Sequence, residues 1–458
     1  MNKFSSQQRK LMYLGGIVLL FIPIVALGLP KSEEQKGGKL ARLRTEHYLD
    51  ETTLGDVPPE GATMNLVLLG MRGVATNVLW LELIQQQKTK NWAEVKATTE
   101  SIIKLQPHFL KVWQHQGWNL AYNVSAEWDL VADRYYWVKE GIKFYKRGIS
   151  QNFMYPELDW YLGDTYAKKI GRADERVQFR RFFKKDPDER DYPSGFDPAV
   201  NPEGLDNYQV AKERYQKSID IERRYGHQQH IMAAALYQSY PARADFDYAA
   251  GLQKDGIFGE RTREAWASAY REWTQVYGKR EFETPGGWIT LEHPMDKLQA
   301  RIVDNQQKLA APRDKVERLL AETELKEIEW ILRYQDMTNY RYWRTRGEAE
   351  RESDTVEAHR QLYEAEDQFF RKGVEDPSEL VLSGLAKFQA MFDRHPELTS
   401  DSDLLEEAVF GLLLWMEALN RNGKNVPEEF PLNALWTAAQ DKIPEFRKDF
   451  LRKMNAPR

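Results

Sequence analysis

The stretch from Val95 to Pro187 constrains the fold more than any other part of the chain, because helical segments alternate there with short breaks. A helix predicted over Trp92 to Leu105 ends before Pro107, and proline cannot continue a helix interior. The next segment opens at Phe109, and a further helix is expected from about Leu130 to Tyr145. This alternation predicts stacked helix–turn–helix units.

The segment that begins at Pro156 resembles a tetratricopeptide (TPR) repeat, a helical hairpin of about 34 residues. With Pro156 as the first position, the residues typical of the repeat fall on Leu162, Gly163, Tyr166, Phe179 and Pro187. Glu175 and Phe182 stand where the family carries alanines. The resemblance implies an α-solenoid of helical hairpins whose first helices line a groove for a protein or peptide.

Weaker resemblances extend beyond this unit. Ala211 to Ile219 resembles the second helix of another repeat, and Gly384, Phe388 and Pro396 show the same half-pattern. The blocks Leu105–Phe109 and Trp118–Asn123 also resemble uncharacterised membrane-anchored bacterial proteins with TPR-like domains. That last resemblance implies no particular reaction, and the array is expected to be irregular.

Composition narrows the class of protein. The chain has 458 residues, a net charge of −5 and no cysteine. Disulfides and thiolate metal sites are therefore excluded, and a nucleic-acid partner is not expected from the overall charge. Because β-branched alternating runs are scarce, an all-α fold is predicted.

The amino terminus carries the longest apolar run, from Leu11 to Leu29, which contains no charged residue. As a helix it would be roughly 28 Å long, against a hydrocarbon core of about 30 Å. We therefore expect residues 11–29 to be a transmembrane signal anchor in contact with the lipid bilayer. The basic residues within 1–10 favour a cytoplasmic amino terminus and an extracytoplasmic body, which makes a single-pass membrane protein.

Two alternatives remain for this run, a cleaved signal peptide with its cleavage site near Ala26-Leu27-Gly28 and a buried helix of a soluble domain. Residues 30–63 are expected to be a tether. A second membrane helix over Met64 to Gln87 is opposed by Arg72 and Glu82, which lie inside that apolar segment.

The rest of the chain divides by composition. The predicted parts are TPR-like repeats over 64–187, a proline-rich loop over 188–204, a helical region with one half-repeat over 205–294, long charged helices over 295–375 with a turn near Pro312, and a carboxy-terminal helical region over 376–458. The proline-rich loop is expected to be either a spacer or an insertion that contacts a partner.

Three motifs suggest chemistry, and each has a plainer interpretation. His227 and His230 are spaced for one helical face, but no acidic residue follows at a matching step, so surface or capping roles are favoured. The arginine-rich stretch from Arg341 to Arg351 also carries glutamates, which favours a solvated helix face over a nucleic-acid contact. Asp255 to Trp266 resembles the turn and helix of small peptidoglycan-binding domains, although an inter-helix turn explains its glycines.

The function that these observations favour is a membrane-anchored scaffold for protein–protein interaction, with no catalytic residue, metal or cofactor identified. The alternatives are peptidoglycan binding through Asp255–Trp266 and an enzyme with an unrecognised site. The candidate groove residues share helical faces at four-residue steps: Gln114, Trp118 and Tyr122 on one helix, and Trp160, Asp164 and Lys168 on another. The competing interpretation is that Trp118 and Trp160 are packed between helices.

Overall fold

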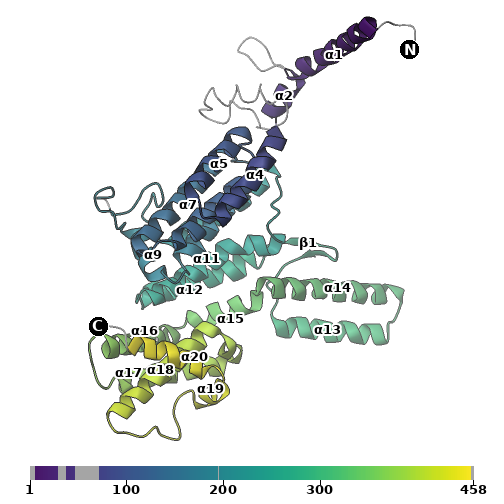
Figure 1. The fold of residues 1–458 in the computed structure, drawn as a ribbon. Coiled ribbons are helices and arrows are strands. Elements are labelled where there is room, and N and C mark those ends of the chain that lie inside the picture. Colours follow the sequence, from purple (N-terminus) through teal and green to yellow (C-terminus); the bar gives the residue numbers. More distant parts are fainter. Residues whose placement is uncertain (1–5, 29–37, 47–71, 194, 455–458) are drawn as a thin grey trace. The chain divides into compact units, whose positions relative to one another are not determined.

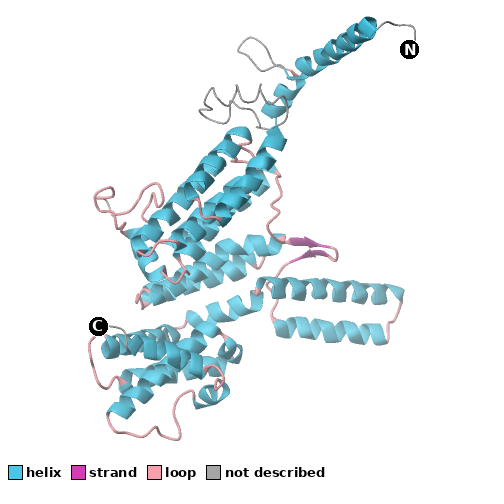
Figure 2. Ribbon diagram, viewed as in Figure 1, coloured by secondary structure: helices cyan, strands magenta, loops and turns pink. Residues whose placement is uncertain are grey.

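A computed structural model describes residues 6–28, 38–46, 72–193 and 195–454, in two compact units, Met1–Leu158 and Asp159–Arg458. Among the described residues the only strands are β1 (Phe282–Thr284) and β2 (Gly287–Ile289), which pair as one antiparallel hairpin (Figure 2). Helices form most of the remaining described residues, so the predicted all-α class is confirmed.

The predicted membrane anchor is not supported. Residues 11–28 lie in α1 (Ser6–Gly28), which begins with the polar run Ser6–Lys10 and contains Pro23. None of the described helices combines the length and apolar character that crossing a bilayer requires. The transmembrane signal anchor over 11–29 and the single-pass localisation, with a cytoplasmic amino terminus and an extracytoplasmic body, are therefore wrong.

The predicted tether over 30–63 lies mostly outside the described residues. Its described part includes α2 (Lys39–Glu46). The apolar segment from Met64 to Gln87 is described only from Arg72 onward, where it forms most of α4.

Two helical hairpins make up the described part of the first unit from Arg72 onward (Figure 1). One consists of α4 (Arg72–Lys88) and α5 (Trp92–Leu105), and the other of α6 (Leu110–Asn119), its π-helical continuation (Leu120–Val124) and α7 (Val131–Gln151). Asn91 caps α5 by accepting a hydrogen bond from the Glu94 amide. Gly117 lets α6 approach α7, because a Cβ there would lie 2.6 Å from the Tyr145 ring.

The second unit begins within α8 (Glu157–Asp164), at Asp159, and contains most of the segment that resembles a TPR repeat. Its helices are α8 with a π-helical continuation (Thr165–Ile170), α9 (Arg176–Lys184), α10 (Asn207–Tyr225), α11 (Ala234–Lys254) and α12 (Glu260–Arg271), which a π-helical turn (Glu272–Tyr277) extends. Leu162, Tyr166 and Phe179 are fully buried. The helix α10 packs against the π-helical continuation and forms a hairpin with α11.

The proline-rich segment between α9 and α10 is folded onto the helices. Tyr166 Oη donates a hydrogen bond of 2.7 Å to the carbonyl of the buried Val200. The Asn201 side chain donates to the Phe183 and Leu205 carbonyls and accepts from the Leu205 amide. The backbone of this segment is therefore fixed by its own polar groups rather than by helix or sheet.

The charged region forms the helical hairpin that the sequence indicated near Pro312, with α13 (Met295–Ala310) and α14 (Lys315–Thr338) side by side (Figure 1). The remaining helices are α15 (Tyr340–Glu350), α16 (Ser353–Phe370), α17 (Ser378–Arg394), a 3₁₀ turn (Pro396–Ser400), α18 (Ser402–Arg421), α19 (Asn433–Ala438) and α20 (Ile443–Met454).

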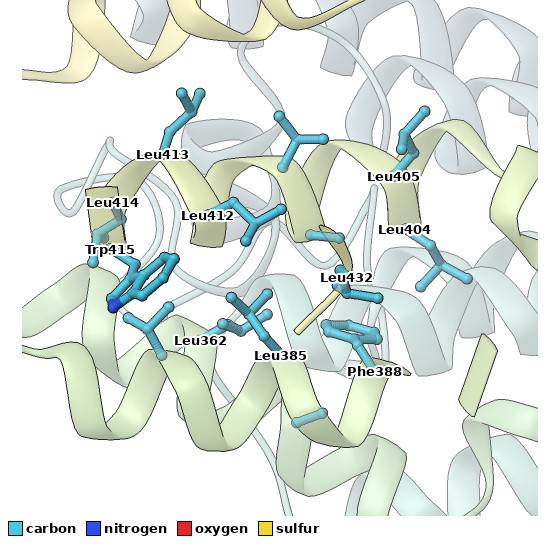
Figure 3. Packing of buried hydrophobic residues seen from close by; sticks show 14 of the residues in the cluster. Leu362, Leu385, Phe388, Leu404, Leu405, Leu412, Leu413, Leu414, Trp415 and Leu432 are labelled. Atoms are coloured by element: carbon cyan, nitrogen blue, oxygen red, sulfur yellow. The ribbon is translucent and has the colours of Figure 1, made fainter. Parts of the chain in front are cut away.

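Two hydrophobic clusters stabilise this second unit. One is centred on Phe246, Trp266 and Trp273 and joins α11, α12, α14 and α15. The other, which we call the carboxy-terminal cluster, joins α15 to α20. In Figure 3, Leu412 and Leu432 meet Leu385 and Phe388 between α18 and α17. Consecutive helices thus pack as hairpins in each unit, a helical repeat-like fold that is compatible with a solenoid.

Candidate functional site

The groove residues predicted on α6 and its π-helical continuation fall into two environments. Gln114 is buried, its side chain accepts a hydrogen bond from Lys111 Nζ at 3.0 Å, and its carbonyl accepts one from Tyr145 Oη at 2.9 Å. Trp118 is 43% exposed and stacks on the half-buried Tyr122, with 5.5 Å between ring centroids. Gln114 therefore belongs to the packing of the hairpin, and Trp118 and Tyr122 form an aromatic surface.

The groove residues predicted on α8 and its π-helical continuation include one residue, Lys168, that lines a cavity. Trp160 is only 5% exposed and packs against the rings of Tyr215 and Tyr240, as the packing interpretation expects. Asp164 and Lys168 form an ion pair of 2.7 Å one helical turn further on. The Lys168 side chain is 48% exposed and lines a cavity.

This cavity, which we call the Arg243 pocket, has a volume of about 120 Å³. Its wall contains three cationic residues, one acidic residue and three aromatic rings: Lys168, Arg172, Arg243, Asp247, Tyr215, Tyr240 and Trp343. On α11, Tyr240, Arg243 and Asp247 occur at three- and four-residue steps, which places them on one helical face. Trp343 comes from α15, about a hundred residues later in the chain.

Two of the three cations have carboxylate partners. Lys168 pairs with Asp164, and Arg172 pairs with Asp247, whose charge raises the pKa of Arg172. Among the described residues Arg243 has no carboxylate partner, and its Nε is buried without a hydrogen-bond acceptor. The pocket therefore retains about one net positive charge.

Aromatic rings hold the Arg243 guanidinium in place. Its Cζ lies 5.7 Å from the Tyr240 ring centroid and 5.8 Å from that of Trp343. The indole Nε1 of Trp343 is a second buried donor that finds no acceptor among the described residues. A buried donor left unsatisfied costs on the order of 1–3 kcal/mol, so packing rather than a hydrogen bond of these two atoms keeps both side chains in place.

A second and wider groove, of about 760 Å³, borders α10, α11 and α12. Lys212 and Asp245 form an ion pair of 2.7 Å in its wall, and burial raises the pKa of Asp245. Four acidic and two basic residues line the groove: Glu203, Glu213, Asp220, Asp245, Lys212 and Lys217. The wall of this groove therefore carries a net charge of about −2, which would repel an acidic ligand.

The motifs that suggested chemistry serve other purposes. The positive φ of Gly226 ends α10, and His227 and His230 follow in a non-helical segment, so helical spacing does not bring them together. No cluster of three or more acidic or histidine side chains suitable for a metal occurs in the described part of the chain. Arg346 is buried in ion pairs with Glu350 and Asp401.

The turn that resembled a peptidoglycan-binding motif joins α11 to α12. Gly256 and Gly259 adopt positive φ, and the Phe258 ring lies 5.4 Å from Tyr363 of α16. Trp266 is fully buried in the core. The glycines and aromatics of this motif therefore take part in helix packing.

Of the residues that line the pocket, only Lys168 was predicted from the sequence as a groove residue. The i, i+3, i+7 pattern of Tyr240, Arg243 and Asp247 is a detectable signal, but it is common in charged helices. No sequence spacing connects Trp343 to α11, because tertiary packing alone brings α15 there.

Comparison with protein-family models, with curated proteins and with solved structures finds no match for the chain. The fold and the pocket therefore define the class by themselves: a helical repeat-like protein with a small cationic and aromatic pocket.

Proposed function

We propose that this chain is a TPR-like scaffold that binds another protein or a peptide, and that the partner docks at the Arg243 pocket. The repeat positions support the family resemblance, because Leu162, Tyr166 and Phe179 are buried and Gly163 sits against Tyr215 of the next hairpin. Packing between successive hairpins is what the TPR pattern encodes.

The observation that carries the proposal is the composition of the pocket wall. Helical-repeat proteins bind through surfaces assembled from successive helices, and this pocket takes residues from the π-helical continuation of α8, from α10 and from α11. Rigid aromatic side chains and arginine are the residue types that contribute most to binding at protein interfaces. Lys168 lies beside these residues, and its half-exposed side chain is accessible to a partner.

Crosslinking of the full chain to partners in a lysate of the source cells, followed by mass spectrometry, tests the proposal. The Lys168→Ala variant should lose the captured partner several-fold, because it removes an accessible charge at the pocket. Lys212→Ala is the matched control, since Lys212 also forms a 2.7 Å ion pair but lines the wider groove.

Equal capture by the wild type and the Lys168→Ala variant would show that the Arg243 pocket is not part of the binding surface. Loss of capture in the Lys212→Ala variant alone would place the partner in the wider groove instead. A Trp118→Ala variant tests the aromatic surface on α6 in the same experiment.

A further inference from the structure

Arg243 is the charged group of the pocket that the fold itself does not neutralise. Lys168 and Arg172 each have a carboxylate partner, whereas the described residues supply none for Arg243. We propose that Arg243 binds a carboxylate group of the ligand, an inference that rests on the proposed function and names the chemistry of the group recognised.

The charge of the pocket selects a singly charged anion. With two ion pairs intact, one guanidinium remains uncompensated, and a carboxylate supplies one negative charge. A doubly charged phosphate would leave an excess negative charge next to Asp247, which lies in the same wall. The attraction between unlike charges is strengthened in a partly enclosed site, and so is the repulsion between like charges.

The donors of the pocket also match a carboxylate. Arg243 lines the pocket, and its guanidinium carries five N–H donors, of which the one on Nε is buried. A carboxylate has two oxygens that accept several hydrogen bonds and suits the planar guanidinium geometry. The rings of Tyr240 and Trp343 flank the guanidinium, so an apolar or aromatic group next to the carboxylate would contact them.

Small probes separate the charge from the shape of the ligand. Hippurate carries one carboxylate beside an aromatic amide, and hippuramide has the same shape without the charge. Quenching of tryptophan fluorescence in the full chain should report hippurate, because Trp343 lines the pocket. Hippuramide should bind at least about tenfold more weakly, since the charge-assisted hydrogen bonds are missing.

Variants locate the binding event. Arg243→Gln should weaken hippurate binding by about tenfold or more, because it replaces the charged planar guanidinium with a shorter, neutral amide. Arg333→Gln is the matched control, since Arg333 also lies over an aromatic ring, that of Trp330 at 4.9 Å, but outside the pocket. Circular dichroism melting of both variants checks that each remains folded.

Several results would overturn the assignment: no response to hippurate, equal responses to hippurate and hippuramide, or undiminished binding by a folded Arg243→Gln chain. Tighter binding of phenyl phosphate than of hippurate would also overturn it in favour of a phosphoryl group. N-acetylaspartate amide, which carries only a side-chain carboxylate, distinguishes an acidic side chain from a chain end as the source.

The two proposals can fail separately. Partner capture that depends on Lys168 but not on Arg243 would support the scaffold function and contradict carboxylate recognition by Arg243. Hippurate binding that depends on Arg243, combined with no captured partner, would support the carboxylate site and contradict the scaffold function.

Discussion

A buried histidine joins α15, α16 and α18 through two carboxylates. His359 Nε2 lies 2.9 Å from Glu350 Oε2, and His359 Nδ1 lies 2.9 Å from Glu407 Oε1. A neutral imidazole has a single N–H and could donate to only one of these carboxylates, so the geometry requires the doubly protonated, charged ring. Burial opposes that charge, but the charges of Glu407 and Glu350 outweigh it and raise the pKa of His359 to about 10.

The protonation of His359 makes stability depend on pH. Because its pKa rises from 6.5 to about 10 on folding, the folded chain holds the proton more tightly than the unfolded chain does. The resulting stabilisation is full below pH 6.5, decreases above it and is lost as the pH rises through 10. In urea unfolding, the wild type should therefore lose more stability across this window than a His359→Gln variant.

Near pH 6 the His359→Gln variant should be less stable by about 3–5 kcal/mol, because breaking a buried ion pair leaves a carboxylate without its partner. Arg360→Gln is the neighbouring control. Arg360 pairs with Glu357 and Glu364 at the surface, so its loss should cost less than about 1 kcal/mol and leave the pH slope unchanged. Parallel pH profiles for the wild type and His359→Gln would show that the buried ring is neutral.

At the scale of elements, the contact between α8 and α10 depends on a missing side chain. A Cβ on Gly163 would lie 3.0 Å from the Tyr215 ring and 3.2 Å from the Ala211 carbonyl oxygen. The Tyr215 ring is itself confined by Trp160 and Tyr240, at centroid distances of 5.9 and 5.0 Å. The neighbours of Gly163 therefore have little room to move.

The Gly163→Leu variant should be destabilised by about 1–3 kcal/mol, because the added side chain forces apart α8 and α10. The midpoint of urea unfolding measures the loss. Gly73→Leu in α4 is the control, since its nearest neighbour is the flexible end of the Gln106 side chain at 3.8 Å. Leucine favours helix over glycine there, so this control should be neutral or stabilising. If both variants unfold alike, close approach at Gly163 is not what fixes the hairpin.

The elements that sequence reasoning found are those whose packing is local in the chain. Leu162, Gly163 and Phe179 belong to one hairpin pattern, and the α13–α14 hairpin follows from its periodicity and the break at Pro312. The order in the segment after α9 was not predictable, because it depends on Tyr166 and Asn201 finding backbone carbonyls of that segment and its flanks. The prediction of a membrane anchor was wrong. It rested on the apolar run alone, whereas α1 also includes the polar residues before that run, and none of the described helices has the length and apolar character to cross a bilayer.

At the scale of the molecule, the same distinction explains the pocket. Lys168 could be found from its place on the repeat, whereas Arg243 and Trp343 become partners only when α11 and α15 pack. Phe246 makes that packing, because its ring stacks on Trp343 at 5.1 Å and also contacts Trp266 and Trp273. The pocket is therefore a product of the cluster around Phe246, which a motif search along the sequence does not reveal.

The two clusters of the second unit should open independently, because they share few helices. Leu412→Ala leaves a cavity between α18 and α17 in the carboxy-terminal cluster and should cost about 2–5 kcal/mol. Hydrogen exchange, measured by mass spectrometry, should then be faster in α16, α17 and α18 and little changed in α11 and α12. The reason is that each helical hairpin in a repeat-like fold is stabilised mainly by contacts with its nearest neighbours. Phe246→Ala is the reciprocal variant, and it should accelerate exchange in α11 and α12 and spare α18. A uniform increase over the whole second unit in both variants would mean that it unfolds as one cooperative body, and the Arg243 pocket would then depend on every cluster rather than on the one around Phe246.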